Sequence, residues 1–66
     1  MQRDLNSKLI ESFVYDEEDQ LLRLHLTSGQ IRVYRDVPKD IVEGLARSLS
    51  PGSFYIENIR HKFSAE

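Results

Sequence analysis

The sequence predicts an α+β fold in one small domain, a three-stranded antiparallel β-meander followed by two helices. Three observations support this: apolar and polar residues alternate between residues 8 and 34, a Val-Pro step ends the alternation at Val37-Pro38, and apolar residues recur three or four apart beyond it. Residues 8–64 are expected to form the fold. The polar residues 1–7 are expected to be a flexible amino-terminal segment.

The first strand is expected over residues 8–15, with apolar side chains on both faces. Residues 16–20, which include four acidic side chains in a row, are expected to form a solvated five-residue loop. A loop of five places Val14 on the leucine face of the next strand, and Phe13 and Tyr15 on the reverse face. Calcium binding is excluded because the acidic run has neither the alternating oxygen ligands nor the glycine of a calcium loop.

The second and third strands are expected to form a hairpin around Ser28-Gly29. Leucines at alternate positions of residues 21–26 define its apolar face. An even-length turn sets Leu24 opposite Val33, whereas a three-residue turn would set Leu24 opposite Arg32. Burial of apolar residues favours the even-length turn.

Two helices are expected after the sheet. Val37-Pro38 ends the third strand, and residues 38–49 carry apolar residues at helical spacing, with a stripe that should cover the leucine face. Ser50 offers an amino-terminal cap and Pro51 a first helical position for a second helix, expected over about residues 54–63.

Composition restricts the class of protein. Nine Lys and Arg against eleven Asp and Glu give a net charge of −2, which argues against strong, purely electrostatic binding to nucleic acid. The chain has no cysteine, no apolar run long enough to span a membrane and no signal-peptide pattern at its amino terminus. We therefore expect a cytoplasmic protein that does not contact a membrane, monomeric by default.

A set of short features occurs in a fixed order along the chain: Ile10, Tyr15-Asp16, alternating apolar residues before Gly29, Tyr34, Val37-Pro38, and Ser50-x-Gly52-x-Phe54-Tyr55 followed by Ile59-Arg60. This order resembles the KTSC domain, a small family found at the carboxyl terminus of some lysyl-tRNA synthetases and as stand-alone bacterial proteins. Arg32 stands where the family has the first tyrosine of a Tyr-x-Tyr motif, and Ile56 where it often has asparagine. The resemblance implies a domain of unknown role, for which RNA binding is conjectured from the synthetase context.

The proposed pairings collect aromatic and basic residues on the face opposite the leucines. Such a surface can stack bases and hold phosphates, at roughly 1–3 kcal/mol for each stacked base. The candidate nucleic-acid-binding residues are Tyr15, Arg23, His25, Arg32, Tyr34, Arg60 and Lys62. In the alternative interpretation the second helix buries the aromatic side chains, the strand arginines are ordinary solvated residues, and residues 60–62 are the cationic last turn of that helix.

No enzymatic role is expected. His25 and His61 have no nucleophile or acid partner at a motif spacing, and the sequence indicates no cofactor and no metal site. The alternative function is a small protein–protein interaction module without nucleic-acid binding, because the reverse face of the sheet is partly apolar and the sheet has two edges.

Overall fold

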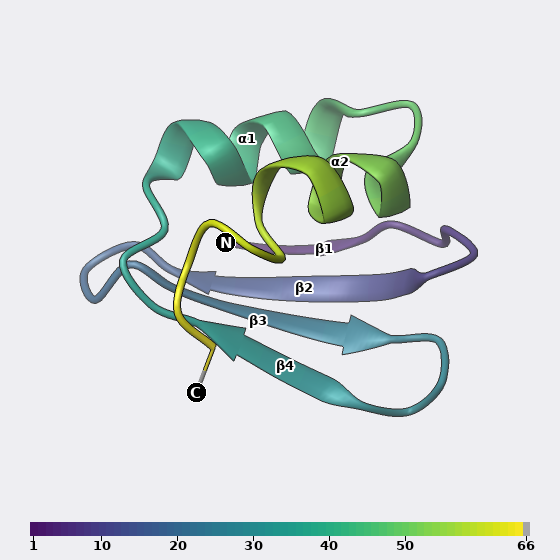
Figure 1. The fold of residues 1–66 in the computed structure, drawn as a ribbon, viewed down its shortest axis with the longest axis horizontal. Helices are drawn as coiled ribbons and strands as arrows, with labels where there is room; N and C mark the ends of the chain where they lie inside the picture. The colour runs from purple at the N-terminus through teal and green to yellow at the C-terminus, as the bar shows by residue number, and fades with distance from the viewer. Residues whose placement is uncertain (66) are drawn as a thin grey trace.

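The computed structural model, which describes residues 1–65, has a four-stranded antiparallel sheet with two helices packed on one of its faces (Figure 1). The α+β class is therefore as predicted, but the sheet has one strand more than expected. In chain order the elements are β1 (Gln2–Asp4), β2 (Ile10–Asp16), β3 (Leu21–Leu26), β4 (Ile31–Tyr34), α1 (Lys39–Arg47) and α2 (Pro51–Asn58). The strand order in the sheet is the same as in the chain.

The additional strand is β1, in the segment that we predicted to be flexible. It pairs antiparallel with β2, with Gln2 opposite Val14 and Asp4 opposite Ser12. Backbone groups hold it in place: the Tyr15 N–H donates to the Met1 carbonyl at 2.7 Å. All three β1 side chains are exposed, so the strand has no apolar alternation by which the sequence could reveal it.

The loop between β2 and β3 has four residues, Glu17 to Gln20, and the predicted five-residue loop is wrong. The Asp16 carboxylate accepts the backbone N–H of Glu18 at 3.1 Å, which builds a tight turn. Gln20 ends that turn in the left-handed region, with φ of 53°. The loop is exposed to solvent as predicted, but it is one residue shorter because an aspartate hydrogen-bonds within its own turn.

The shorter loop moves β2 by one residue relative to β3. Tyr15 lies opposite Leu22 and Phe13 opposite Leu24, so both aromatic side chains join the leucine face and not the reverse face as predicted. The register shifts again between Ile10 and Ser12, and this irregularity returns Ile10 to the leucine face.

The hairpin between β3 and β4 also differs from the prediction. The Leu26 N–H donates to the Gln30 carbonyl at 2.8 Å, which leaves a three-residue turn. Gly29 lies in this turn with a φ of 95°, a backbone conformation that residues with a side chain rarely adopt. Leu24 therefore faces Arg32, and Tyr34, opposite Leu22, supplies the apolar cover that we assigned to Val33.

The helices cover the leucine face, as predicted for the first of them. α1 ends at Arg47 and buries Val42 and Leu45 against the sheet, whereas Leu49, predicted within this helix, lies beyond it and is fully exposed. α2 begins at Pro51, three residues before the predicted start, and ends five residues before the predicted end.

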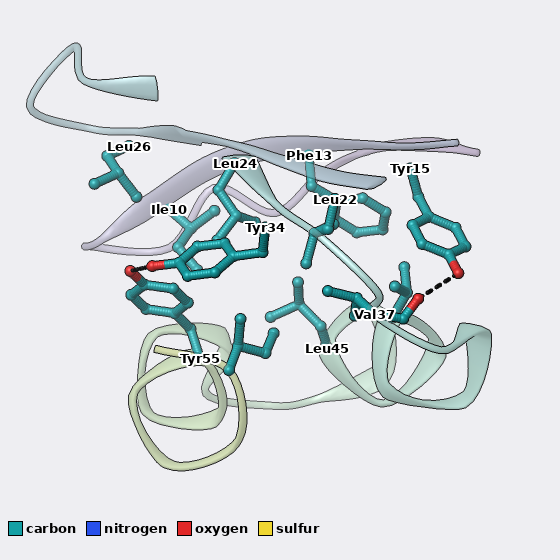
Figure 2. Packing of buried hydrophobic residues seen from close by; sticks show 12 residues of the cluster. Ile10, Phe13, Tyr15, Leu22, Leu24, Leu26, Tyr34, Val37, Leu45 and Tyr55 are labelled. Carbon is teal, nitrogen blue, oxygen red and sulfur yellow. Dashed lines mark hydrogen bonds between the residues drawn. The ribbon is translucent and has the colours of Figure 1, made fainter. Parts of the chain in front are cut away.

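One layer of side chains between sheet and helices makes up the core (Figure 2). Its buried members come from β2, β3, β4, both helices, the segment before α1 and the residue after α2: Ile10, Phe13, Tyr15, Leu22, Leu24, Leu26, Tyr34, Val37, Val42, Leu45, Tyr55 and Ile59. No helix in residues 1–65 lies on the other face of the sheet.

Candidate functional site

The structure does not gather the seven candidate residues on one surface. Tyr15 and Tyr34 are 3% and 2% exposed and belong to the core, so neither ring is available to stack on a base. The basic candidates divide between the two faces of the sheet. The prediction of a shared aromatic and basic face is therefore wrong, because it depended on the two hairpin registers that the structure corrects.

Tyr15 has a structural role at one end of the core. Its hydroxyl donates a 2.6 Å hydrogen bond to the Val37 carbonyl, next to the proline that precedes α1 (Figure 2). Burial, followed by the charge of Glu17, raises the pKa of Tyr15 above its ordinary value. The charges of Asp16 and Asp40 also raise the pKa of Tyr15, and the charge of Lys39 lowers it.

Tyr34 and Tyr55 meet at the opposite end of the core. Their hydroxyl oxygens lie 2.5 Å apart, and the rings pack edge to face with centroids 5.9 Å apart. Burial and the hydrogen bond to Tyr55 raise the pKa of Tyr34 to about 12. The Tyr34 phenol is thus protonated at neutral pH.

Arg32 belongs to the same strand as Tyr34, and Arg60 follows the helix that carries Tyr55. Arg32 precedes Tyr34 by two residues on the helix-covered side of β4, and its guanidinium donates to the Gln30 side-chain oxygen at 3.2 Å. Arg60 follows α2, and its backbone N–H donates to the Tyr55 carbonyl at 2.9 Å. Lys62 is exposed in the same turn. We call Arg32, Arg60 and Lys62 the basic rim.

Arg23 and His25 lie elsewhere, on the side of the sheet without helices. On this open face Arg23 sits between Val14 and Val33 in the strand register, and His25 between Ser12 and Ile31. A shallow hollow of about 290 Å³ is lined by Val14, Asp16, Leu21, Arg23 and Val33. We define the open face by the side chains Asp4, Val14, Asp16, Leu21, Arg23, His25, Ile31 and Val33.

A second hollow, of about 540 Å³, lies between the segment before β2 and the start of α2, and the sequence did not predict it. Leu9, Leu49 and Ile56 contribute its apolar lining, and Lys8 is its cation. Leu49 and Ile56 are both exposed, although the helical spacing suggested that Leu49 faces the core. Leu49 lies outside the core because α1 ends at Arg47, and the apolar stripe alone does not reveal where this helix ends.

Two negative findings concern the described part of the chain. Residues 1–65 contain no group of three His, Cys, Asp or Glu side chains that could hold a metal ion. No helix within the same residues has the length and apolar character needed to cross a membrane.

Fold and core together define a small α+β domain in which a meander sheet is covered on one face by two short helices. The model of the KTSC domain family matches residues 6–63 of the chain, so the chain belongs to this family. A curated protein of Tsukamurella paurometabola, whose name gives no activity, is 31% identical to this chain over 61 residues. The matched region covers 92% of this chain and 91% of that protein.

The fold also occurs in a solved structure of the same family. The crystal structure of a KTSC domain protein from Yersinia pestis superimposes with a TM-score of 0.93, covering 100% of this chain and 93% of that one at 23% identity. At this identity the comparison establishes the shared fold.

The residues that carry the family resemblance have structural roles in this chain. Tyr15 bonds to Val37, Tyr34 to Tyr55, and a side chain at Gly52 would crowd Leu9. The two departures are both exposed: Arg32 lies on β4, and Ile56 lies on α2. The motif therefore describes how the core is built, and binding must be sought on the surface around it.

Proposed function

We propose that this KTSC domain is a non-enzymatic interaction module that associates with a second copy of itself through the open face of the sheet. The observation that carries the proposal is the hollow in this face, where Arg23 stands among the half-buried side chains of Val14, Leu21 and Val33. Apolar residues around an arginine are typical of the centre of a protein–protein interface.

The charges of the open face favour a second copy over a polyanion. Asp4 and Asp16 lie on it together with Arg23 and His25. In a two-fold contact the same patch meets itself, so a patch that carries both signs can place each charge near its opposite. The two carboxylates would repel the phosphates of a nucleic acid.

The size of the face indicates a weak dimer. The chain extends over 27 × 22 × 22 Å, so one face presents roughly 600 Å², compared with about 800 Å² per partner in a standard interface. Association is therefore expected at high protein concentration.

A non-enzymatic role agrees with the distribution of the titratable groups. His25 lies on the open face, whereas His61 lies in the turn after α2, on the other side of the sheet. The hollow in the open face contains one acidic and one basic side chain and no serine, threonine or histidine as its lining. A cytoplasmic location stays a prediction from the sequence.

Sedimentation velocity tests the proposal at protein concentrations from about 10 μM to about 1 mM, the range of weak interfaces. The test variant is Ile31→Asp on the open face, and the matched control is Ile56→Asp on α2, since these isoleucines are 56% and 46% exposed. We expect the wild type to dimerise, the test variant to weaken dimerisation at least about tenfold and the control to leave it unchanged. A wild type that stays monomeric at the highest concentration, or equal effects of the two substitutions, would overturn the proposal.

A second candidate function is RNA binding through phosphate contacts at the basic rim, without base stacking. The observation that favours it is that Arg32, Arg60 and Lys62 are all exposed, Arg32 on the helix-covered side of β4 and the other two in the turn after α2. Titration with single-stranded RNA at about 50 and 200 mM salt tests it, because phosphate contacts weaken steeply with salt. Binding at neither salt concentration would exclude it.

A further inference from the structure

The hollow of about 540 Å³ between residues 6–9 and the start of α2 gathers apolar side chains at the surface. Its volume is within the range of roughly 300–1,000 Å³ that is typical of ligand sites. Two of its lining residues are large, apolar and exposed: Leu49 fully and Ile56 to 46%. A lone exposed leucine is ordinary, whereas several apolar residues around one hollow are typical of a binding surface.

Contacts within the protein fix the walls of this hollow. On one side the Thr27 hydroxyl donates to the Lys8 carbonyl at 2.7 Å, and the Thr27 N–H donates to the Leu9 carbonyl at 3.0 Å. On the other side the first turn of α2 approaches so closely that a Cβ at Gly52 would lie 3.3 Å from the Cβ of Leu9. The hollow is therefore preformed, and binding there orders little of this chain.

The charge of the hollow restricts the kind of partner. Among the described residues that line it, Lys8 is the only charged one, and no carboxylate offsets its charge. The complementary group is thus an anion next to an apolar group. A polyanion is disfavoured because a single cation neutralises few phosphates. A lipid surface is disfavoured because the apolar residues line a concavity and are not accompanied by several cations.

We propose that this hollow is a docking site for the carboxyl-terminal end of a partner protein whose last residues are apolar. A chain end carries an apolar side chain and a carboxylate on one residue, so both fit within a hollow of this size. The apolar side chains cover Leu49 and Ile56, and the terminal carboxylate lies beside the Lys8 ammonium. Because Leu49 is fully exposed, the hollow is open to solvent, and the preceding part of the partner chain leaves through this opening.

Docking here is independent of self-association through the open face, because none of the residues that line the hollow belongs to that face. NMR titration of the labelled protein tests the site with an acetylated tripeptide that ends in two leucines and a free carboxyl group. Two apolar side chains and one charge support an affinity of about 1 mM, so the titration extends to about 10 mM. We expect saturable shifts at the amides of Leu9, Leu49 and Ile56. Absent or non-saturating shifts would overturn the site.

A matched pair of isoleucine variants tests the apolar contact. Ile56→Ala should weaken binding of the tripeptide at least about fivefold, because it removes part of the apolar wall. Ile31→Ala removes the same atoms from an isoleucine of the open face that is 56% exposed, and it should change the affinity less than about twofold. Equal effects of the two substitutions would overturn the site.

A coupled pair of changes tests the carboxylate. The carboxyl-terminal amide of the same tripeptide should bind about threefold more weakly than the acid, as expected for one exposed ion pair. In the Lys8→Gln variant the acid and the amide should bind equally. Lys62→Gln, which removes an exposed lysine in the turn after α2, should preserve the threefold difference. A preference for the acid that persists without Lys8 would contradict the proposed ion pair.

Two further measurements separate the chain end from other occupants. Octanoate presents an apolar chain and a carboxylate without a peptide, and we expect it to bind more weakly than the tripeptide. Tighter binding of octanoate at the same amides would assign the hollow to a fatty acid and overturn docking of a chain end. We expect Leu49→Asp to sediment as the wild type does. If this variant weakens self-association, the hollow contacts a second copy and the proposal is likewise overturned.

Discussion

The Tyr15 hydroxyl and the Val37 carbonyl, 22 residues apart in the chain, are joined by a buried hydrogen bond of 2.6 Å. This bond connects the end of β2 to the segment that leads into α1, at the point where the chain leaves the sheet. The Val37 carbonyl accepts no other hydrogen bond within residues 1–65, so the tyrosine supplies its one partner. An aromatic residue that looked like a candidate for base stacking instead fixes the position of the first helix.

Tyr15→Phe is expected to destabilise the domain by about 1–3 kcal/mol. The ring stays in the core, but the Val37 carbonyl is left buried without a donor, and an unsatisfied buried acceptor costs about this much. Urea unfolding followed by circular dichroism measures the change. An unfolding midpoint equal to that of the wild type would show that the carbonyl finds another partner and that this hydrogen bond does not anchor α1.

The elements of this fold could be predicted, but their registers could not. Alternation identified three strands, and the Val37-Pro38 step together with the apolar stripe identified α1. The length of the first loop depends on Gln20 adopting a positive φ and on Asp16 accepting hydrogen bonds within its own turn. Neither feature has an apolar pattern, and a one-residue error at this point exchanges the two faces of β2.

The same error explains why the candidate surface was misplaced. With Phe13 and Tyr15 assigned to the reverse face, the aromatic residues seemed to accompany Arg23, although they lie in the core. Arg32, Arg60 and Lys62 were predicted on one surface with Arg23 and His25, which the structure places on the other face of the sheet. Arg60 lies in a turn and not in α2, because α2 ends at Asn58, which the helical spacing of residues 54–63 did not indicate.

Stability is expected to fall above pH 10 because Tyr34 ionises less readily in the folded protein than in the unfolded chain. Its pKa is raised to about 12 in the fold by burial and by Tyr55, compared with an ordinary value of 10.0. Between these values the unfolded chain has released the proton and the folded protein retains it, so a rising pH favours unfolding. The stabilisation is complete below pH 10, and about 1–3 kcal/mol is lost as the pH rises to 12.

Urea unfolding at intervals between pH 8 and about pH 11.5 measures this loss, with Tyr34→Phe as the control. Tyr15 and Lys39, whose pKa values are also raised in the fold, contribute a decline in the same direction. The difference between the wild type and the control therefore isolates the share that belongs to Tyr34. Parallel curves for the two proteins would show that Tyr34 ionises equally readily in both states.

We expect that position 44 must be glycine because a larger side chain would clash with the ring of Phe54, and not because the backbone of α1 needs glycine there. A Cβ at position 44 would lie 2.7 Å from the Cζ atom of Phe54, closer than such contacts occur. Alanine is the better helix former by about 1 kcal/mol, but the clash would displace a half-buried ring that packs against the core. We therefore expect Gly44→Ala to destabilise the wild type by about 1 kcal/mol.

In a Phe54→Ala background, where the obstacle is absent, the same substitution should stabilise by about 0.5–1 kcal/mol. Urea unfolding of the four proteins gives the coupling energy of the pair. A substitution that acts with the same sign in both backgrounds would mean that the ring moves aside without cost and that packing between the helices does not select glycine at this position.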